Sequence, residues 1–218
     1  MTATRGKGLF ITFEGGEGCG KSTQIALLHA HLESQGYEVV ATREPGGTPL
    51  AEAIRQLLLD PANDMLCAEA ELLLYEASRA QHVAERMRPS LEAGKIVLSD
   101  RFYDSTTAYQ GAGRRLSGDK LNMLHGIATK GLTPCLTIVI DIPVEVGLAR
   151  ATKNGSDRIE KERLDFHERV RAGFLQIARE EPERVKLVDG MRSVDEVASE
   201  IRGYVDAALK IGGSGRGS

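Results

Sequence analysis

A glycine-rich stretch near the N-terminus constrains the fold more than any other part of this sequence. Gly15, Gly20, Lys21 and Ser22 match the pattern G-x-x-x-x-G-K-[ST]. An apolar run rich in strand formers, residues 9–13, precedes the pattern, and apolar side chains at helical spacing follow it. A strand, this loop and a helix in that order are typical of a loop that cradles nucleotide phosphates. A glycine-rich turn that matched by chance would need neither flank.

The residue types in this phosphate loop suit a triphosphate. Glycines let consecutive backbone N–H groups point inward, and the following helix adds its free N–H groups and positive dipole end. Lys21 can reach the β- and γ-phosphates of ATP, and the Ser22 hydroxyl can bind Mg²⁺. The ATP-binding residues predicted in the loop are Gly15, Gly16, Glu17, Gly18, Cys19, Gly20, Lys21, Ser22 and Thr23.

Length and composition predict one domain without a nucleic-acid or membrane partner. The chain has 218 residues, and we expect a single domain over residues 1–210 followed by a disordered, linker-like tail at 211–218. A net charge of −3 leaves no basic footprint for nucleic acid, and no apolar run is long enough to span a bilayer. Three cysteines without metal-binding spacing predict reduced thiols in a cytoplasmic protein.

Strand and helix signals alternate along the chain. Strands are predicted at residues 9–13, 37–43, 95–100, 136–141 and 185–188. Helices are predicted at about 21–35, 49–59, 67–88, 116–130, after Pro143, 162–180 and 194–209. This alternation predicts an α/β fold with a five-stranded parallel sheet, helices on both faces and right-handed crossovers.

Charged residues follow two of the predicted strands, at the edge where ligands bind in such sheets. Arg43 and Glu44 begin a turn after the second strand, and either a ligand contact or a plain turn accounts for them. Asp100 and Arg101 end the third strand, where an acid can face Mg²⁺ and an arginine can face an anion. A structural Asp–Arg pair is the alternative.

Two polar segments are candidates for contacts with a nucleotide. Residues 104–115 carry amide, hydroxyl and phenol groups suited to base edges and sugars. Composition alone predicts a loop here, and Gly111 and Gly113 are expected to end any helix that starts near Phe102. Residues 150–162 are rich in Arg and Lys and are expected to bend at Asn154–Gly155, which suits a short lid over phosphates. A solvated charged loop is the alternative for this second segment.

The long helix predicted at 67–88 carries an apolar stripe with two interpretations. The stripe either packs in the core, which periodicity alone favours, or faces a second copy of the chain. Its members are Leu66, Ala70, Leu73, Leu74 and Ala77.

No general base for an alcohol acceptor stands out in the sequence. The five histidines are scattered, and we expect solvent-exposed or capping roles for them. A monophosphate acceptor is already an anion near neutral pH, so it needs positive charge rather than a base. Arginines without a base therefore predict phosphoryl transfer to a monophosphate.

Five separated stretches resemble the thymidylate kinase family, in its bacterial type. They are Phe13-Glu-Gly-Gly-Glu17 with Gly20-Lys-Ser-Thr23, Thr42-Arg-Glu-Pro-Gly-Gly-Thr48, Ser78-Arg-Ala-Gln-His82, Asp100-Arg101 with Ala108-Tyr-Gln-Gly111, and Asp157-Arg-Ile-Glu160. The resemblance implies a P-loop fold of the nucleoside-monophosphate kinase type. It also implies Mg²⁺-assisted transfer of the ATP γ-phosphoryl group to dTMP, giving dTDP and ADP for dTTP synthesis, and a homodimer formed through helices.

The resemblance assigns roles to single residues. It implies that Glu17 contacts the sugar 3′-hydroxyl, that Glu44 lies near the acceptor and the metal, and that Arg101 bridges the two phosphates. Tyr75 stands where the family usually has a Phe that stacks on thymine. The remaining predicted substrate contacts are Arg43, Arg79, Thr106, Tyr109 and Gln110, with Tyr109 crowding a 2′-hydroxyl.

Position 18 is Gly rather than Arg, so the resemblance implies that catalytic positive charge comes from the lid. The candidates are Arg150, Lys153 and Arg158, and Arg158 is preferred as a catalytic residue beside Lys21, Arg101 and Glu17. Arg150 and Lys153 are also expected to contact ATP. The expected metal ligands are Ser22 and Asp100.

Two other functions fit parts of the sequence. A kinase of the same fold acting on another small molecule would keep the phosphate loop and differ in its acceptor. A nucleotide switch would carry a guanine-reading N-K-x-D stretch, which the sequence lacks.

Overall fold

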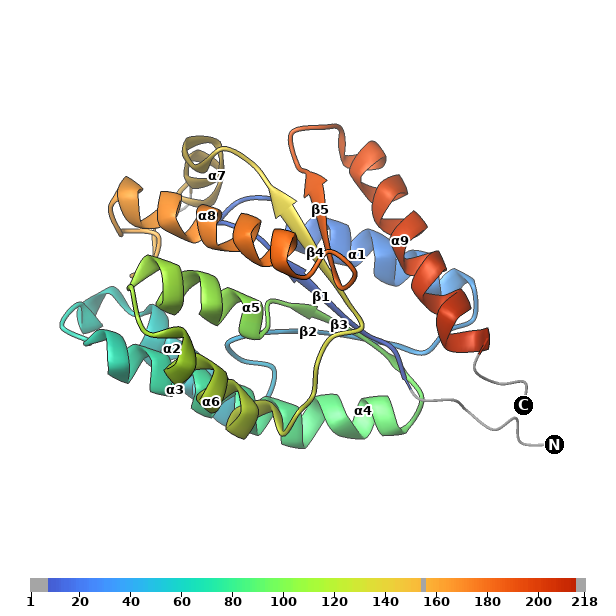
Figure 1. Ribbon diagram of the computed structural model, residues 1–218, viewed down its shortest axis with the longest axis horizontal. Coiled ribbons are helices and arrows are strands. Elements are labelled where there is room, and N and C mark those ends of the chain that lie inside the picture. The colour runs from blue at the N-terminus through green and yellow to red at the C-terminus, as the bar shows by residue number, and fades with distance from the viewer. Residues whose placement is uncertain (1–7, 154–155, 215–218) are drawn as a thin grey trace.

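The computed structural model describes residues 8–153 and 156–214, with a parallel sheet at its centre (Figure 1). The bend predicted at Asn154–Gly155 lies outside the described residues. The strands are β1 Phe10–Glu14, β2 Val39–Arg43, β3 Ile96–Asp100, β4 Leu136–Asp141 and β5 Val185–Asp189. Their order is β2-β3-β1-β4-β5, and every pairing between neighbours is parallel. The predicted five-stranded parallel sheet is confirmed.

Register brings the charged strand ends together. Phe13 of β1 pairs with Asp100 of β3, and Asp100 also pairs with Arg43 of β2. Because carboxyl ends of parallel strands meet at one edge, the residues that follow these strands share a crevice. Residues far apart in the sequence are thereby brought into one site.

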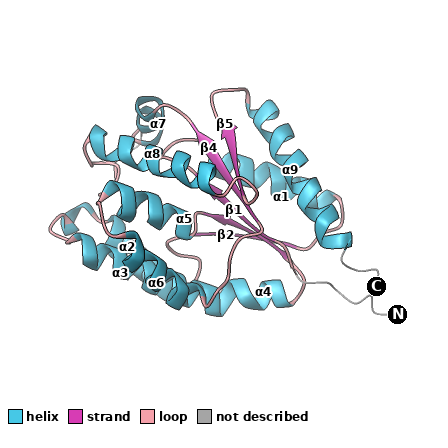
Figure 2. Ribbon diagram, in the orientation of Figure 1, coloured by secondary structure: helices cyan, strands magenta, loops and turns pink. Residues whose placement is uncertain are grey.

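Helices cover both faces of the sheet (Figure 2). The α-helices among the described residues are α1 Lys21–Ser34, α2 Pro49–Leu59, α3 Ala68–His82, α4 Arg88–Glu92, α5 Tyr103–Thr106, α6 Gly118–Thr129, α7 Val144–Ala151, α8 Leu164–Glu180 and α9 Val194–Ser214. Shorter helical segments are η1 Pro61–Asn63 and the π-helical η2 Val83–Met87 and η3 Thr107–Gly113. None of the helices described is both long and apolar enough to cross a membrane.

The pleat of the strands divides the core into two layers. Ile11 and Phe13 of β1 pack with the buried side chains of α1 and α9, whereas Phe10 packs on the opposite face with Val83 and Phe102. Side chains alternate between the faces of a strand, so β1 is buried on both sides. This explains why its sequence is almost continuously apolar.

The structure differs from the sequence prediction at residues 67–88. The predicted single helix is divided into α3, η2 and α4. Pro89 has no N–H to donate to a carbonyl one turn earlier, and its ring crowds that turn. The widened π-helical turn directly before α4 accommodates this interruption.

The structure also differs at two segments expected to lack regular structure. Composition predicts residues 104–115 as a loop, but they are helical as far as Gly113, one of the two glycines expected to end a helix starting near Phe102. Here η3 packs on α8 and buries Ala108 and Tyr109 against Phe166 and Phe174. At the other end of the chain, α9 continues to Ser214 and covers the first part of the predicted tail 211–218. Residues 215–218 lie outside the described residues.

Candidate active site

The phosphate loop lies between β1 and α1, in the strand–loop–helix context predicted from the sequence. Lys21 is buried, and its Nζ donates hydrogen bonds to the carbonyl oxygens of Gly15, at 3.3 Å, and Gly16, at 3.0 Å. These bonds fold the lysine side chain back over the loop. Its positive charge is therefore held at the place where phosphates would enter.

A close approach of α7 to the phosphate loop explains why position 18 carries no side chain. Gly18 has a φ of +61°, and a Cβ at this position would lie 2.2 Å from the carbonyl oxygen of Gly147. It would also lie 3.0 Å from the Cβ of Arg150. No arginine could occupy position 18 here, but the same approach places Arg150 directly beside the loop.

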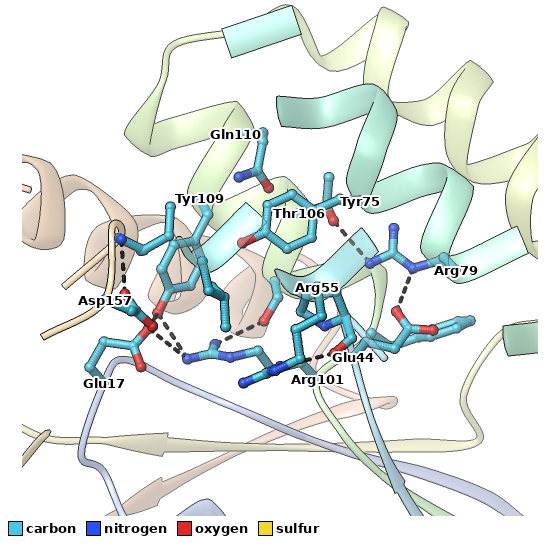
Figure 3. A pocket seen from close by; sticks show the side chains of 15 residues that line it. Glu17, Glu44, Arg55, Tyr75, Arg79, Arg101, Thr106, Tyr109, Gln110 and Asp157 are labelled. Carbon is cyan, nitrogen blue, oxygen red and sulfur yellow. Dashed lines mark hydrogen bonds and ion pairs between the residues drawn. The ribbon is translucent and has the colours of Figure 1, made fainter. Parts of the chain in front are cut away.

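Two adjoining hollows lie at the carboxyl edge of the sheet. The outer hollow, of about 350 Å³, is lined by residues 17–23 of the phosphate loop together with Arg43 and Asp100. The inner hollow, of about 80 Å³, lies between the loop, α3 and η3, and Figure 3 displays the side chains around it. Both hollows are lined by Glu17, Glu44, Arg55 and Arg101.

Two oxygen-bearing side chains of the chemistry that Mg²⁺ prefers meet in the outer hollow. Ser22 Oγ donates a hydrogen bond of 3.2 Å to Asp100 Oδ2. No cluster of three or more His, Cys, Asp or Glu side chains suited to a metal was found within residues 8–153 and 156–214. Mg²⁺ nevertheless needs few protein ligands, because it keeps several waters and takes the rest of its shell from substrate phosphates. The hydroxyl and carboxylate fit such a site.

Arg101 connects the two hollows. Its NH1 donates to the Gly15 carbonyl, at 2.9 Å, and to Ser105 Oγ, at 3.0 Å. Its NH2 donates to Glu17 Oε1, at 2.9 Å, and to the Tyr109 hydroxyl, at 3.0 Å. The guanidinium also lies 4.9 Å from the centre of the Tyr109 ring. Figure 3 shows the side chains of Arg101, Glu17 and Tyr109 meeting on one side of the inner hollow.

Two acidic residues beside Arg101 have opposite electrostatic environments. Burial alone raises the pKa of Glu17, but the charges of Arg101 and Lys21 and a hydrogen bond from Tyr109 outweigh it and lower the pKa to about 2. Burial and the negative charge of Asp104 raise the pKa of Glu14 to about 8. Glu17 is therefore ionised near neutral pH, whereas the Glu14 site favours the neutral acid.

A second buried network lies at the far end of the inner hollow. Arg79 donates to Glu44 Oε2 at 2.7 Å, to Glu76 Oε1 at 2.6 Å and to Thr106 Oγ1 at 3.0 Å. The Nδ1 of His82 lies 3.1 Å from Glu44 Oε1. Arg79 lines the hollow while its charge is balanced by two carboxylates. Thr106, one of the predicted base contacts, is held by the same guanidinium.

Gln110 and Arg158 meet at one buried carboxylate. Glu71 is fully buried, and its Oε1 accepts from Gln110 Nε2 at 2.8 Å. Its Oε2 lies 2.6 Å from Arg158 NH2, and Arg158 Nε donates to the Leu58 carbonyl at 2.8 Å. Arg158 is buried and lines neither hollow. The prediction that lid closure brings Arg158 to the transferring phosphate therefore requires its guanidinium to leave its partners on α3 and at the end of α2.

The other predicted residues occupy the rims and walls of the hollows. Tyr75 lines the inner hollow, and burial together with the nearby Glu71 raises its pKa. Arg43 lines the outer hollow with a half-exposed side chain that pairs with Glu52 at 3.0 Å. Lys153 is exposed and lines neither hollow.

Sequence reasoning missed several buried charged side chains. Arg55 of α2 lines both hollows and donates to the Pro45 carbonyl at 2.9 Å. The expectation that the histidines are exposed or capping is wrong for His82, His125 and His167, which are buried. Only His82 had a sequence signal, since it ends the Ser78–His82 stretch of α3. The only sequence signal for Arg55 as a site residue was its position shortly after the turn that follows the second strand.

The fold and this site together define a P-loop kinase of the nucleoside-monophosphate type. A phosphate loop faces one hollow, and the adjoining hollow contains arginines and carboxylates. An acceptor bound there would meet positive charge in the form of Arg55, Arg79 and Arg101.

Comparison with known proteins agrees with this class. The sequence model of the family described as thymidylate kinase matches residues 13–201. The thymidylate kinase of Geotalea uraniireducens is 50% identical over 212 residues, which cover 94% of this chain and 100% of the relative. That of Symbiobacterium thermophilum is 50% identical over 201 residues, covering 92% of this chain and 94% of the relative.

A solved structure extends the similarity to three dimensions. The crystal structure of thymidylate kinase from Ehrlichia chaffeensis is 35% identical, covers 92% of this chain and 99% of its own, and has a TM-score of 0.75. The chain therefore belongs to the thymidylate kinase family, and it is an enzyme of the nucleoside-monophosphate kinase class.

The lowered pKa of Glu17 predicts a pH-dependent contribution to stability. Its folded-state pKa of about 2 lies below the ordinary 4.5, so the contribution is fully present above pH 4.5 and is lost as the pH falls towards 2. We expect Glu17→Gln to lower the free energy of unfolding at pH 7 by up to about 3 kcal/mol. Urea unfolding between pH 7 and pH 3 should show the difference shrinking only below pH 4.5. The exposed Glu183→Gln serves as the control, and a pH-independent difference for Glu17→Gln would contradict the assignment.

Proposed function

We propose that the two hollows are the donor and acceptor sites of phosphoryl transfer from ATP to dTMP. As a member of the thymidylate kinase family, the chain converts dTMP and ATP into dTDP and ADP. The observation that carries the placement is Arg101, which bonds the phosphate loop through Gly15 and borders both hollows. A cation at this junction suits two phosphates that must approach each other.

The donor site is assigned to the outer hollow. Backbone N–H groups of residues 15–23, the N-terminus of α1 and Lys21 would hold the ATP phosphates. Arg150 supports the same assignment, because α7 brings its Cβ next to Gly18. Arg150 and Arg192 also line a further hollow beside Gly20 and Thr23, where the rest of ATP could extend.

The acceptor site is assigned to the inner hollow. The dTMP phosphate would lie towards Arg101 and Arg55, and the sugar would lie near Glu17 and Tyr109, which are joined by a 2.6 Å hydrogen bond. The base would reach the far end, where the Tyr75 ring can stack on it. The groups there that can read its edge are Arg79, Thr106 and Gln110.

Ser22 and Asp100 would hold Mg²⁺ in the outer hollow. When bound, Mg²⁺ supplies positive charge to the β- and γ-phosphate oxygens. The chain's own residues then provide orientation: Lys21 on the donor, Arg101 between the phosphates, and the buried carboxylates that keep each arginine in place. No general base is required, because the attacking oxygen of a monophosphate is already anionic.

We also propose that the enzyme is a homodimer formed through α2, α3 and α6. Large apolar side chains on and beside these packed helices are exposed: Leu50, Leu57, Met65, Leu73, Met123 and Ile127. Contiguous exposed apolar surface is typical of an interface. We propose a cytoplasmic location, since the exposed thiols of Cys67 and Cys135 suit a reducing compartment that also supplies ATP.

The first experiment follows ADP release with ATP, Mg²⁺ and a panel of acceptors: dTMP, dUMP, dCMP, dGMP and AMP. We expect strong turnover with dTMP and loss of at least about 10²-fold in kcat for Lys21→Ala, because the lysine charge would stabilise the transferring group. Preference for another monophosphate would keep the chemistry and overturn the base assignments. ATP binding without turnover on any acceptor would instead favour a nucleotide switch.

The placement of the basic residues predicts different kinetics for Arg150→Ala and Arg158→Ala. Arg150 lies beside the loop, so its loss should lower kcat/KM for ATP about tenfold or more with the KM for dTMP within about twofold. Arg158 is held by Glu71, so its loss should act chiefly on the dTMP KM. Arg179→Ala is the matched control, because this arginine is exposed and lines neither hollow. A large fall in kcat for Arg158→Ala with an unchanged dTMP KM would support Arg158 as the catalytic lid residue. An unchanged kcat/KM for ATP in Arg150→Ala would contradict the Arg150 assignment.

The dimer proposal predicts the effect of a charge on the exposed face of α3. Leu73 is 55% exposed, and Leu73→Glu should convert a sedimenting dimer into a monomer, because a buried unpaired carboxylate is costly at an apolar interface. Met191→Glu changes a residue of similar exposure beyond β5 and should leave the dimer intact. Equal sedimentation of both variants and the unaltered chain would refute the interface.

A further inference from the structure

We propose that Glu71 is a positioning residue that sets which pyrimidine the enzyme accepts. It does so by fixing the orientation of the Gln110 amide. This inference rests on the proposed function, because it takes the inner hollow as the site of the base. It deepens that function by naming the group that decides whether a donor or an acceptor faces the base edge.

The first step is the ionisation of Glu71. Burial alone raises its pKa, but hydrogen bonds from Arg114 and Gln110 and the charges of Arg114 and Arg158 outweigh burial and lower the pKa. Glu71 is therefore a carboxylate, and a carboxylate can only accept hydrogen bonds.

The second step is the orientation that this carboxylate imposes. Because Glu71 has no proton to donate, the Gln110 atom 2.8 Å from its Oε1 must be the amide nitrogen. Arg114 donates two further hydrogen bonds to Glu71, at 3.1 and 2.9 Å, and the Arg158 cation forms an ion pair with it at 2.6 Å. If the Gln110 amide were rotated by 180°, its carbonyl oxygen rather than its NH₂ group would face the buried Glu71 carboxylate. Two acceptors would then face each other without a proton between them. The carboxylate thus locks the amide.

The third step is what the locked amide presents to the hollow. Figure 3 shows the Gln110 amide directed towards Tyr75 and Thr106 at one end of the inner hollow. Its Oε1 accepts no hydrogen bond from any residue in the described part of the chain, so it is an acceptor in need of a donor. Arg79 donates to Thr106, one turn before Gln110, and three of its five N–H groups are engaged by protein acceptors, which leaves donors on a side chain that lines the same hollow as Gln110.

The Gln110 carbonyl oxygen and the Arg79 guanidinium complement the hydrogen-bonding edge of thymine and uracil but not that of cytosine. Thymine and uracil carry a carbonyl at position 4 beside an N3–H donor, which complements Arg79 and Gln110. Cytosine carries an amino group at position 4 beside an unprotonated N3, which places donor against donor and acceptor against acceptor. Unpaired polar groups in a desolvated site give strong discrimination.

Glu71→Gln tests the proposal, because an amide at position 71 can donate as well as accept. Its oxygen should turn to the arginines and its NH₂ to Gln110, which then presents its own NH₂ to the base. We expect the ratio of kcat/KM for dTMP over dCMP to fall about tenfold or more. The ratio for dTMP over dUMP should stay within about twofold, because these two bases share the same edge.

The controls separate orientation from general damage. Glu162→Gln removes another carboxylate that pairs with Arg114, at 2.6 Å, and should leave both ratios unchanged. In a Gln110→Met background, adding Glu71→Gln should change the dTMP over dCMP ratio no further if Glu71 acts through Gln110. Glu71→Asp keeps the charge and withdraws the carboxylate by one methylene. The same fall is expected in this variant, so the test survives if Glu71→Gln does not fold.

The outcomes are distinct. A dTMP over dCMP ratio within about twofold of the unaltered enzyme in both Glu71 variants overturns the inference, as does an equal fall in both ratios. If the unaltered enzyme does not phosphorylate dTMP, the proposed function fails. If it does and the ratios do not move, only the role of Glu71 fails.

Discussion

The arginine at the end of β3 holds the site together. Arg101 has a φ of 73°, which costs a non-glycine residue about 1–2 kcal/mol, and its four side-chain hydrogen bonds offset that strain. Two of these bonds reach the phosphate loop and its Glu17, and two reach residues at and beyond α5. The position of the loop relative to the inner hollow therefore depends on one guanidinium. A cation fixed in this way needs little reorganisation when negative charge develops beside it, which is the physical basis of electrostatic catalysis.

Helix α3 supports the rest of the inner hollow through an unusual distribution of polarity. Its inward face carries Glu71, Glu76 and Arg79, all buried, while Leu73 and Ala77 face outwards. Burying charges is expensive unless each is paired, and here every one of these side chains has an ion-pair partner. The charged groups are thus desolvated and oriented in the folded protein itself, so that a ligand has to displace only the water of the hollow.

The sequence predicted the parts of the fold that depend on local pattern. The five strands, the phosphate loop and most helix positions followed from periodicity and glycine placement, and the motif residues Lys21, Ser22, Asp100 and Arg101 do lie together at one sheet edge. The sequence did not indicate which way individual side chains point. Arg158, predicted to reach the phosphates on lid closure, pairs with Glu71 in this structure, and His82, expected to be exposed or capping, is buried beside Glu44. The helical segment within residues 104–115 packs on α8, a contact that composition alone does not reveal. These outcomes depend on contacts between segments far apart in the chain, which no local pattern records.

The two-sided character of α3 limits how this enzyme can vary. An ordinary surface helix has a solvent-facing side on which most substitutions change stability by less than about 0.5 kcal/mol. In α3 the inward side is committed to balanced charges, and the outward side presents the apolar residues of the exposed face. A polar replacement on the outward side would disturb the proposed dimer interface, and an apolar replacement on the inward side would leave a buried charge unpaired. Few substitutions in α3 are therefore expected to be neutral. Compounds aimed at the inner hollow would accordingly meet a wall in which resistance substitutions are costly to the enzyme itself.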